Sequence, residues 1–169
     1  MDVPPLSYFQ VSDKRFTFNH FLQETSISNV LDDFYEDKQD EGFHRMRSLI
    51  EHRALTVHND VTRHWSGLNG APFPDHFLER VKGSLAEYDA GMTKKKYIDV
   101  HNYHFTPQSL AFIVDAVYNL GLANLRVHRL YETLEGRFEF GIVLKKCTPE
   151  PDSQSEIETE PLFPSAEAL

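Results

Sequence analysis

The sequence has few of the residues and segments that mark several common protein classes. It contains one cysteine, Cys147, in 169 residues. A single cysteine excludes an intrachain disulfide framework and is typical of a reducing compartment. No apolar stretch approaches the roughly 18 residues that a membrane-spanning helix requires. The N-terminal "MDVPPLSYF" also lacks the basic region and the apolar run of a signal peptide. We therefore expect a cytoplasmic protein.

Basic residues are also scarce. The chain has 17 lysines and arginines against 26 aspartates and glutamates, which gives a formal net charge of -9. A charge of this sign repels a phosphate backbone and an anionic membrane surface. We therefore expect neither nucleic acid nor a membrane as a partner.

The acidic excess is concentrated at the C-terminal end. The segment "CTPEPDSQSEIETEPLFPSAEAL", residues 147–169, carries six acidic residues and no lysine or arginine. Its prolines, serines and acids leave little to bury, which predicts a disordered acidic tail. Residues 1–146 suit one domain, because a hydrophobic content of 40% over this length supports a single core.

The middle of the chain, about residues 25–92, shows helical periodicity. Ser26 is a candidate N-cap, and the apolar residues after it follow the spacing of one helix face: Ile27, Val30, Leu31, Phe34 and Tyr35. A second helix is expected from about Glu41 and a third over residues 75–90. The segment "TVHNDVTRHWSGLNGAPFP" between them is rich in Gly, Asn and Pro, so we expect a loop, with a short hairpin as the alternative.

The flanking parts of the chain show strand patterns. "LSYFQV" near the N-terminus suits a buried strand, and residues 97–100 suit another. Thr106 followed by Pro107 is an N-cap with proline at the first helical position, and Gly121 is placed to end that helix. "LRVHRLYETL" and "RFEFGIVLKK" then form a predicted β-hairpin through Gly136. Together these elements predict an α/β fold.

Several of these phrases resemble one family. The helix that opens with "FTPQSL" and leads into a final hairpin is similar to the last third of class I S-adenosylmethionine-dependent methyltransferases. "VSDKRFTFNHF", "EHRALTVHND" and "DVHNYHFTP" look like segments of one bacterial branch, in the same order. The resemblance covers about residues 6–146. It implies a partial Rossmann-like fold from the fifth strand onward, with a helical insertion, a last helix and an antiparallel β-hairpin.

The part of that fold that binds the cofactor has no counterpart here. Class I methyltransferases place a glycine-rich turn after the first strand and an acid at the end of the second, but no G-x-G occurs in this chain. Ser12 stands where the branch tends to have proline, and Asn19 where it tends to have an acid. The cofactor-binding residues are therefore unknown, and S-adenosylmethionine is expected only if a missing half completes the protein.

The resemblance implies the substrate-side portion of a methyltransferase-like protein that acts on a small molecule or a glycan precursor and is inactive alone. The alternative is a non-catalytic binding or accessory module derived from such an enzyme, and activity of the chain by itself stays open. Without the first four strands, one edge of the sheet has no partner, and unpaired edges promote association. We therefore expect a homodimer or a partner chain that covers this edge.

Candidate site residues follow the first strand. Asp13, Lys14 and Arg15 leave its carboxyl end, which faces the ligand crevice in open α/β sheets, so they are candidates for substrate binding. A solvated charge cluster is the alternative. His20, in the same connection, is a candidate catalytic base for a substrate hydroxyl. For this residue, a histidine at the surface or the edge of the core is the alternative.

Asp99 and His101 complete the catalytic candidates. They alternate on one face of the strand predicted at residues 97–100, so both would point into a shared pocket, as a catalytic or a structural pair. His104 has the opposite parity and is not expected to join them. Phe105 and His58 are added as candidates for substrate binding, with core packing as the alternative for the aromatic ring.

Nine histidines raise the question of a metal site. His52, His58 and His64 recur every six residues, which matches neither the i, i+4 ligand pair of a helical zinc site nor a cysteine-histidine finger. We therefore expect no bound metal.

Overall fold

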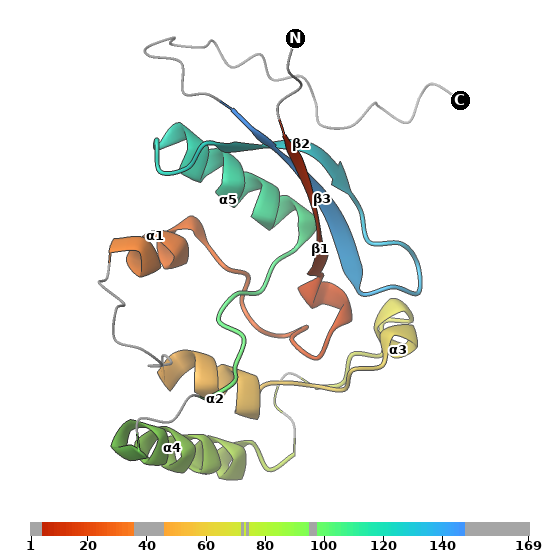
Figure 1. Ribbon diagram of the computed structural model, residues 1–169. Helices are drawn as coiled ribbons and strands as arrows, with labels where there is room; N and C mark the ends of the chain where they lie inside the picture. The colour runs from red at the N-terminus through yellow and green to blue at the C-terminus, as the bar shows by residue number, and fades with distance from the viewer. Residues whose placement is uncertain (1–4, 36–45, 72, 74, 95–97, 148–169) are drawn as a thin grey trace.

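The computed structural model describes residues 5–35, 46–71, 73, 75–94 and 98–147. Within these ranges the chain has a mixed α/β fold with five α-helices, a single turn of 3-10 helix and one three-stranded sheet. In Figure 1 the sheet and helix α5 form one end of the molecule, and the pair α2 and α4 forms the other.

The sheet contains β1 (Leu6–Ser12), β2 (Leu125–Tyr131) and β3 (Glu139–Lys146) in the order β1-β3-β2. β3 lies in the middle and runs antiparallel to both neighbours. β1 and β2 therefore run in the same direction. The predicted strand near the N-terminus and the predicted C-terminal hairpin are both present. The N-terminal strand is not buried as expected, because β1 lies at the edge of the sheet and six of its seven residues are exposed. Gly136 in the hairpin connection has a φ of 73°, which a glycine adopts without strain.

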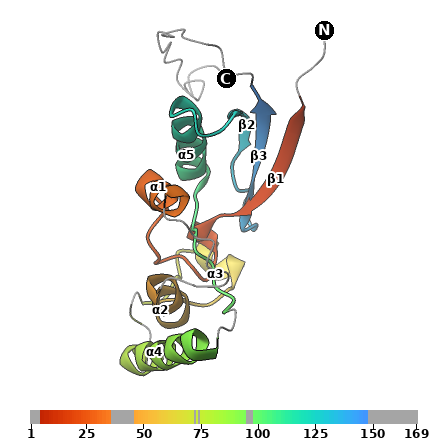
Figure 2. The same ribbon diagram turned by 60° about the vertical axis from the view of Figure 1, so that its left-hand side comes forward.

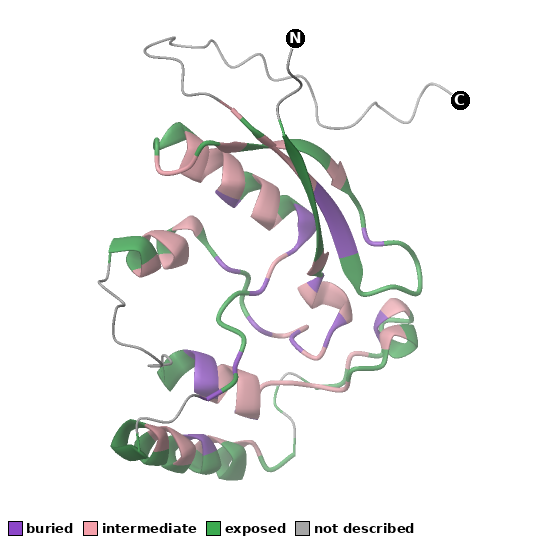
Figure 3. Cartoon of the chain, viewed as in Figure 1, coloured by how far each residue is buried: buried purple, intermediate pink, exposed green. Residues whose placement is uncertain are grey.

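Helix α5 (Pro107–Asn119) covers one face of the sheet and packs against β2 and β3 (Figure 2). It starts as the sequence predicts, because the Thr106 hydroxyl accepts a hydrogen bond from the backbone N–H of Ser109 and proline occupies the first turn. The core follows this packing: Phe140 and Ile142 of β3 are each 1% exposed, and Ile113 of α5 is buried. Figure 3 shows the buried residues along the centre of β3 and at the start of α5.

The other face of the sheet carries two tyrosine rings over a glycine. A Cβ added at Gly141 of β3 would lie 3.0 Å from the ring carbon Cε2 of Tyr8 and 3.2 Å from Cδ2 of Tyr131. Position 141 therefore needs a residue without a side chain for both rings to lie this close to the β3 backbone. In this way aromatic rings from β1 and β2 cover the glycine of the central strand.

The helical insertion lies beside the carboxyl end of β1. It contains α1 (Ile27–Tyr35), α2 (Met46–Ala54), α3 (Val61–Trp65) and α4 (Phe77–Lys94), and the 3-10 helix η1 (Lys14–Phe16) precedes it. α2 and α4 pack against each other. A small second core consists of Leu49, Ile98 and Val100, with Tyr88 packed against it.

Trp65 connects the insertion to the sheet. Its ring stacks on Phe16 with centroids 4.1 Å apart, and its indole N–H donates to the carbonyl oxygen of Arg137 over 2.8 Å. Arg137 belongs to the β2–β3 connection, so this one side chain joins α3, η1 and the hairpin.

Two expectations about local structure need correction. Residues 98–100 form no strand, because Ile98 and Val100 pack on the α2–α4 pair instead of pairing with a sheet; Tyr97 lies outside the described residues. The loop predicted after α2 contains a short helix, α3, and no hairpin in its described part. Asp60 caps this helix by accepting hydrogen bonds from the backbone N–H groups of Thr62 and Arg63.

Other expectations are met only in part. The helix α4 runs four residues beyond the predicted end, and the expected start of α2 at Glu41 lies outside the described residues. Residues 148–169, expected to be a disordered tail, also lie outside them. The mixed α/β class is confirmed. A Rossmann-like sheet is mostly parallel, whereas every strand pair in the described sheet is antiparallel. In the described ranges, no helix is long and apolar enough to cross a membrane.

Replacing Phe140 by alanine tests the position of the main core. Because this side chain is fully buried, Phe140→Ala is expected to lower the free energy of unfolding by about 3–5 kcal/mol, measured by urea denaturation. Phe112→Ala on α5 is the control, since Phe112 is 64% exposed, and it is expected to change stability by less than about 1 kcal/mol. Equal effects of the two substitutions would contradict the described packing.

Candidate functional site

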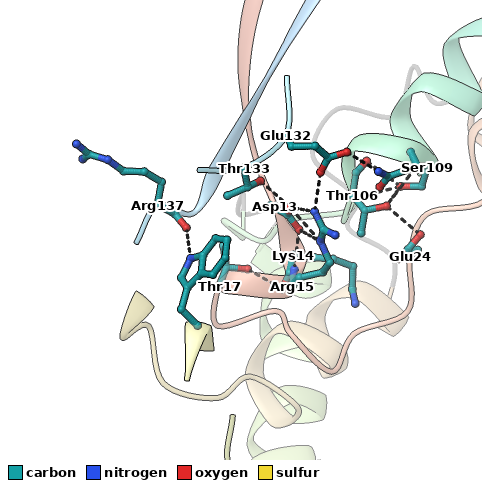
Figure 4. Close-up of polar contacts among 12 residues, drawn as sticks. Asp13, Lys14, Arg15, Thr17, Glu24, Thr106, Ser109, Glu132, Thr133 and Arg137 are labelled. Carbon is teal, nitrogen blue, oxygen red and sulfur yellow. Dashed lines mark hydrogen bonds and ion pairs between the residues drawn. The ribbon is translucent and has the colours of Figure 1, made fainter. Parts of the chain in front are cut away.

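Five of the predicted site residues lie where β1 ends: Asp13, Lys14, Arg15, His20 and Phe105. There η1, the start of α5 and the β2–β3 connection meet, as Figure 4 shows. The backbone N–H of Asp13 donates to the carbonyl oxygen of Phe138 over 2.7 Å, and that of Lys14 donates to Phe105 over 2.9 Å. These two bonds hold the end of β1 between the hairpin and the residues that lead into α5.

Asp13 is a buried carboxylate with a full set of partners. It has no exposed surface and accepts hydrogen bonds from Nε and Nη2 of Arg15 at 2.9 and 2.6 Å, and from the Thr133 hydroxyl at 2.7 Å. The backbone N–H of Arg15 donates to it as well, over 3.0 Å. Both carboxylate oxygens are therefore used within the fold. This arrangement makes Asp13 an anchor for the turn after β1 and leaves it little capacity to bind a substrate.

Arg15 joins that anchor to the start of α5. Its Nη2 lies 3.4 Å from Glu132, which accepts a hydrogen bond of 2.5 Å from the Gln108 amide on α5. The hydrogen bonds from Arg15 to Asp13 raise the pKa of the guanidinium, as does Glu132. Arg15 therefore stays charged, and its charge is balanced by two carboxylates, so it is only partly available to a further anion.

The side chain of Lys14 has a different partner from that of Arg15. Its ammonium donates to the carbonyl oxygen of His20 over 3.0 Å. Burial lowers the pKa of Lys14, although the nearby carboxylates of Glu24 and Asp13 oppose this shift. Phe105, the aromatic candidate, is partly buried beside this position, with its ring stacked on Tyr103 at a centroid distance of 6.0 Å.

His20 has the geometry of an oriented proton acceptor. Its Nδ1 lies 2.6 Å from the carbonyl oxygen of Arg15. A carbonyl oxygen only accepts hydrogen bonds, so Nδ1 carries the ring proton and Nε2 keeps a lone pair. The His20 ring is partly buried and stacks against His64 at a centroid distance of 5.6 Å. The backbone thus fixes both the tautomer and the orientation of this imidazole.

His58 and His64 continue the row of rings but have structural roles. Nε2 of His58 donates to the carbonyl oxygen of Leu68 at 2.8 Å, and its Nδ1 accepts from the backbone N–H of Asp60 at 3.2 Å. His64 is buried, with its ring nitrogens 2.8 Å from Asn69 Oδ1 and 3.1 Å from the carbonyl oxygen of His58. Neither imidazole has a ring nitrogen left for a substrate proton.

An open cleft lies beyond His58. It has a volume of about 490 Å³. Its walls are formed by the segment after α2, the segment after α3 and the beginning of α4, with the lining residues Thr56, Val57, His58, Asn69, Gly70, Ala71, Phe73, Asp75 and Arg80. Of the residues predicted to bind substrate, His58 is the one in this lining, and both of its ring nitrogens are already hydrogen-bonded to the backbone.

Asp99 and His101 do not form the expected shared pocket. Both are exposed, and alternation along a strand does not apply because residues 98–101 are irregular. His101 instead packs near His52, with ring centroids 5.4 Å apart, and its backbone N–H points to Nδ1 of that histidine at 3.5 Å. The carbonyl oxygen of Asp99 accepts from Arg53. Asp99 and His101 therefore contact other residues than His20 and Lys14 do.

His104, which the parity argument left out, is the buried histidine of this region. It is 6% exposed, and its Nδ1 has no hydrogen-bond partner in the described part of the chain. Burial lowers the pKa of His104 to about 4, with smaller contributions from His101, His52 and Lys14. A hydrogen bond in each direction between its backbone and Thr25 fixes its place.

Sequence reasoning also missed Thr133 and Glu132, and it named Asn19 only as a departure from the resembling family. Thr133 is 120 residues from Asp13 along the chain, and no local pattern indicates their contact. Asn19 is buried, and its Oδ1 is without a hydrogen-bond partner among the described residues. An oxygen of this kind inside the turn after β1 marks a place that a donor group of water or a ligand can satisfy.

A metal site sets requirements on the described residues, and a glycine-rich cofactor site sets requirements on the sequence. In the ranges given above, no group of three His, Cys, Asp or Glu side chains is placed to hold a metal ion. The glycine-rich turn of a cofactor site is absent from the sequence. No protein-family model, no curated protein and no solved structure matches the chain. The resemblance to methyltransferases therefore stays a hypothesis that depends on short phrases of sequence.

The low pKa of His104 predicts a loss of stability in acid. The unfolded state binds a proton near the ordinary histidine pKa of 6.5, whereas the folded state does so only near 4. Stability is thus full above pH 6.5 and falls as the pH drops toward 4, by at most roughly 3 kcal/mol. Urea denaturation between pH 7 and 4.5 should show this fall, and His104→Gln should reduce it. His128→Gln, at an exposed position on β2, should leave the fall unchanged; an equal reduction there would contradict the assignment.

Proposed function

We propose that the chain is the substrate-side portion of a methyltransferase-like protein that acts on a hydroxyl group of a small molecule or glycan precursor and is inactive alone. The observation that carries the proposal is the fixed His20 imidazole, whose Nδ1–H donates to Arg15 and whose Nε2 is left with a lone pair. Its position supports the proposal too, because His20 lies in the turn after β1 beside Lys14, whose ammonium donates to the His20 carbonyl oxygen.

The chain's own contribution would be proton transfer and positioning. Nε2 of His20 would accept the proton of the substrate hydroxyl while that oxygen acts as the nucleophile. The Arg15 carbonyl keeps its hydrogen bond to Nδ1 and so stabilises the imidazolium that forms. The ammonium group of Lys14 donates to the carbonyl oxygen of His20 and so places a positive charge in the turn after β1. The residues present do not fit S-adenosylmethionine, so the methyl donor would have to be held by another part.

The sheet is compatible with such a missing part. Over residues 6–12 the outer edge of β1 pairs with no strand in the described chain, and β1 and β2 run parallel to each other around β3. Among the described residues, Phe105 forms a bridge with Asp13 just past the end of β1 on this side. A sheet of this form can continue past β1 without any change in the strands already present.

A second function has its own support. In a non-catalytic binding or accessory module, the charged residues after β1 would be structural. The saturated carboxylate of Asp13 and its contacts with Arg15 and Thr133 favour that view. The two functions differ in what they require of His20.

Two experiments, one of sequencing and one of methyl transfer, distinguish the catalytic function from the accessory function. Sequencing the DNA upstream of the Met1 codon, with a transcript across it, is expected to show an in-frame strand, glycine-rich turn and helix. The longer protein is expected to transfer a labelled methyl group from S-adenosylmethionine, and His20→Gln is expected to lower kcat by about 10²–10⁴-fold. His76→Gln, at a side chain that is 75% exposed, is the control and should keep full activity.

The accessory function would be favoured by a stop codon before Met1, or by full activity of His20→Gln in the longer protein. Calorimetry provides the matching control on the chain alone. The folded chain of 169 residues is expected to bind no S-adenosylmethionine. Binding by this chain would show that a cofactor site exists without a glycine-rich turn.

The free edge of β1 predicts association. Its seven residues, "LSYFQVS", carry no charge and no proline, the usual protections of an edge strand, and Tyr8 and Phe9 are about half exposed. Light scattering at increasing concentration is expected to show a dimer or larger species. Gln10→Lys, which adds a charge to the strand, should shift the protein toward the monomer. A monomer at every concentration, with a cooperative melt, would refute the proposed edge contact.

A further inference from the structure

The cleft beyond His58 has the size of a small-molecule site. Its volume of about 490 Å³ lies within the range of ligand pockets in proteins. The segment after α2 forms one wall, and the residues that precede and begin α4 form the other. The ring row described above links the cleft to His20, since His64 lies 4.3 Å from His58 and 5.6 Å from His20 between ring centroids.

The charges in the cleft balance each other. Asp75 and Arg80 both line it, both are exposed, and their formal charges cancel. Arg80 uses one of its N–H groups in a long hydrogen bond of 3.4 Å to the carbonyl oxygen of Thr56, which leaves the rest of its guanidinium donors for other partners. A cleft with one carboxylate and one guanidinium gives no net attraction to an ion. It provides strong acceptors and strong donors together.

The remaining lining residues add a flat apolar surface and rigid walls. Phe73 lines the cleft and is 67% exposed as a residue, and its ring meets that of Phe77 in a T-shaped contact with centroids 5.4 Å apart. His58 is fixed by backbone hydrogen bonds at both ring nitrogens, and Asn69 is held by His64. An exposed aromatic face beside fixed polar groups suits a ring that is apolar on its C–H faces and polar at its rim.

We propose that this cleft binds a neutral polyhydroxylated ring, such as a pyranose unit. Each hydroxyl group of such a ring both donates and accepts a hydrogen bond, so neighbouring hydroxyls match Asp75 and Arg80 at once. The ring's C–H face packs on Phe73. The inference rests on the proposed function for one point only, that the hydroxyl to be modified reaches His20. It narrows the substrate of that function to a glycosyl compound.

Backbone NMR of the ¹⁵N-labelled chain tests the binding directly. The probes are methyl glucopyranoside, methyl galactopyranoside and N-acetylglucosamine, with inorganic phosphate and glycine as charged comparators. At least one sugar is expected to shift the amide signals of residues 56–58 and 69–71, and the two comparators are expected to leave them unchanged. No sugar-dependent shift, or shifts with phosphate or glycine in place of a sugar, would overturn the inference.

Substitutions locate the contact within the cleft. Asp75→Asn and Arg80→Met are each expected to weaken sugar binding by about tenfold, the effect of losing one charge-assisted hydrogen bond. Asp89→Asn and Lys82→Met make the same charge changes at exposed positions of α4 outside the lining and are expected to bind as the unmodified chain does. Equal weakening in the test and control variants would place the sugar elsewhere and refute the site.

The proposals of sugar binding and of methyl transfer can be refuted independently of each other. The NMR experiment uses the chain alone and needs no cofactor. If sugar binds in the cleft but the longer protein shows no methyl transfer, the proposed function is wrong and the cleft assignment holds. If methyl transfer depends on His20 but the cleft takes no sugar, the glycosyl assignment is wrong and the proposed function holds.

Discussion

The carboxylate of Asp13 is fully buried at the end of β1, and it can remain there only with its partners in place. Loss of one member of a buried ion pair typically costs about 3–5 kcal/mol. Arg15 and Thr133 provide the partners, one from the turn itself and one from the connection that follows β2. This contact ties a turn of the first twenty residues to a hairpin formed more than a hundred residues later, and the geometry of the site depends on it.

The turn held in this way determines where the chemistry can take place. Arg15 turns its side chain toward Asp13 while its carbonyl oxygen faces His20, so the same residue secures the anchor and orients the imidazole. The row formed by His20, His64 and His58 then extends from the sheet into the helical insertion, where the cleft opens. A base at one end and a recognition cleft at the other would suit a substrate with a reacting hydroxyl and a separate bound ring.

Features that depend on neighbouring residues could be predicted from the sequence. Thr106 and Pro107 specify the start of α5, Ser26 and the apolar stripe after it specify α1, and the strand pattern around Gly136 specifies the hairpin. Each of these signals lies within a few residues of the structure that it determines. The mixed α/β class of the fold follows from them, whereas the role of His20 stays a prediction.

Features that depend on distant contacts could not be predicted in this way. The alternation of Ile98 and Val100 has the period of a strand, but it results from packing on Leu49 between two helices. Once that strand is absent, the parity argument that selected Asp99 and His101 has no basis, and the buried residue is His104. In the same way, nothing near Asp13 in the sequence indicates that Thr133 will reach its carboxylate.

The tautomer of the neutral His20 ring tests the central claim most directly, because the hydrogen bond from its Nδ1 to the Arg15 carbonyl oxygen is the basis of its proposed role. Long-range ¹H–¹⁵N correlation spectra of the neutral ring distinguish the two tautomers. A proton on Nδ1 and a lone pair on Nε2 are predicted, with this preference weakened in Thr133→Val, where the turn loses one partner of Asp13. The more common tautomer, with the proton on Nε2, would contradict the claim that the turn after β1 presents His20 as a base.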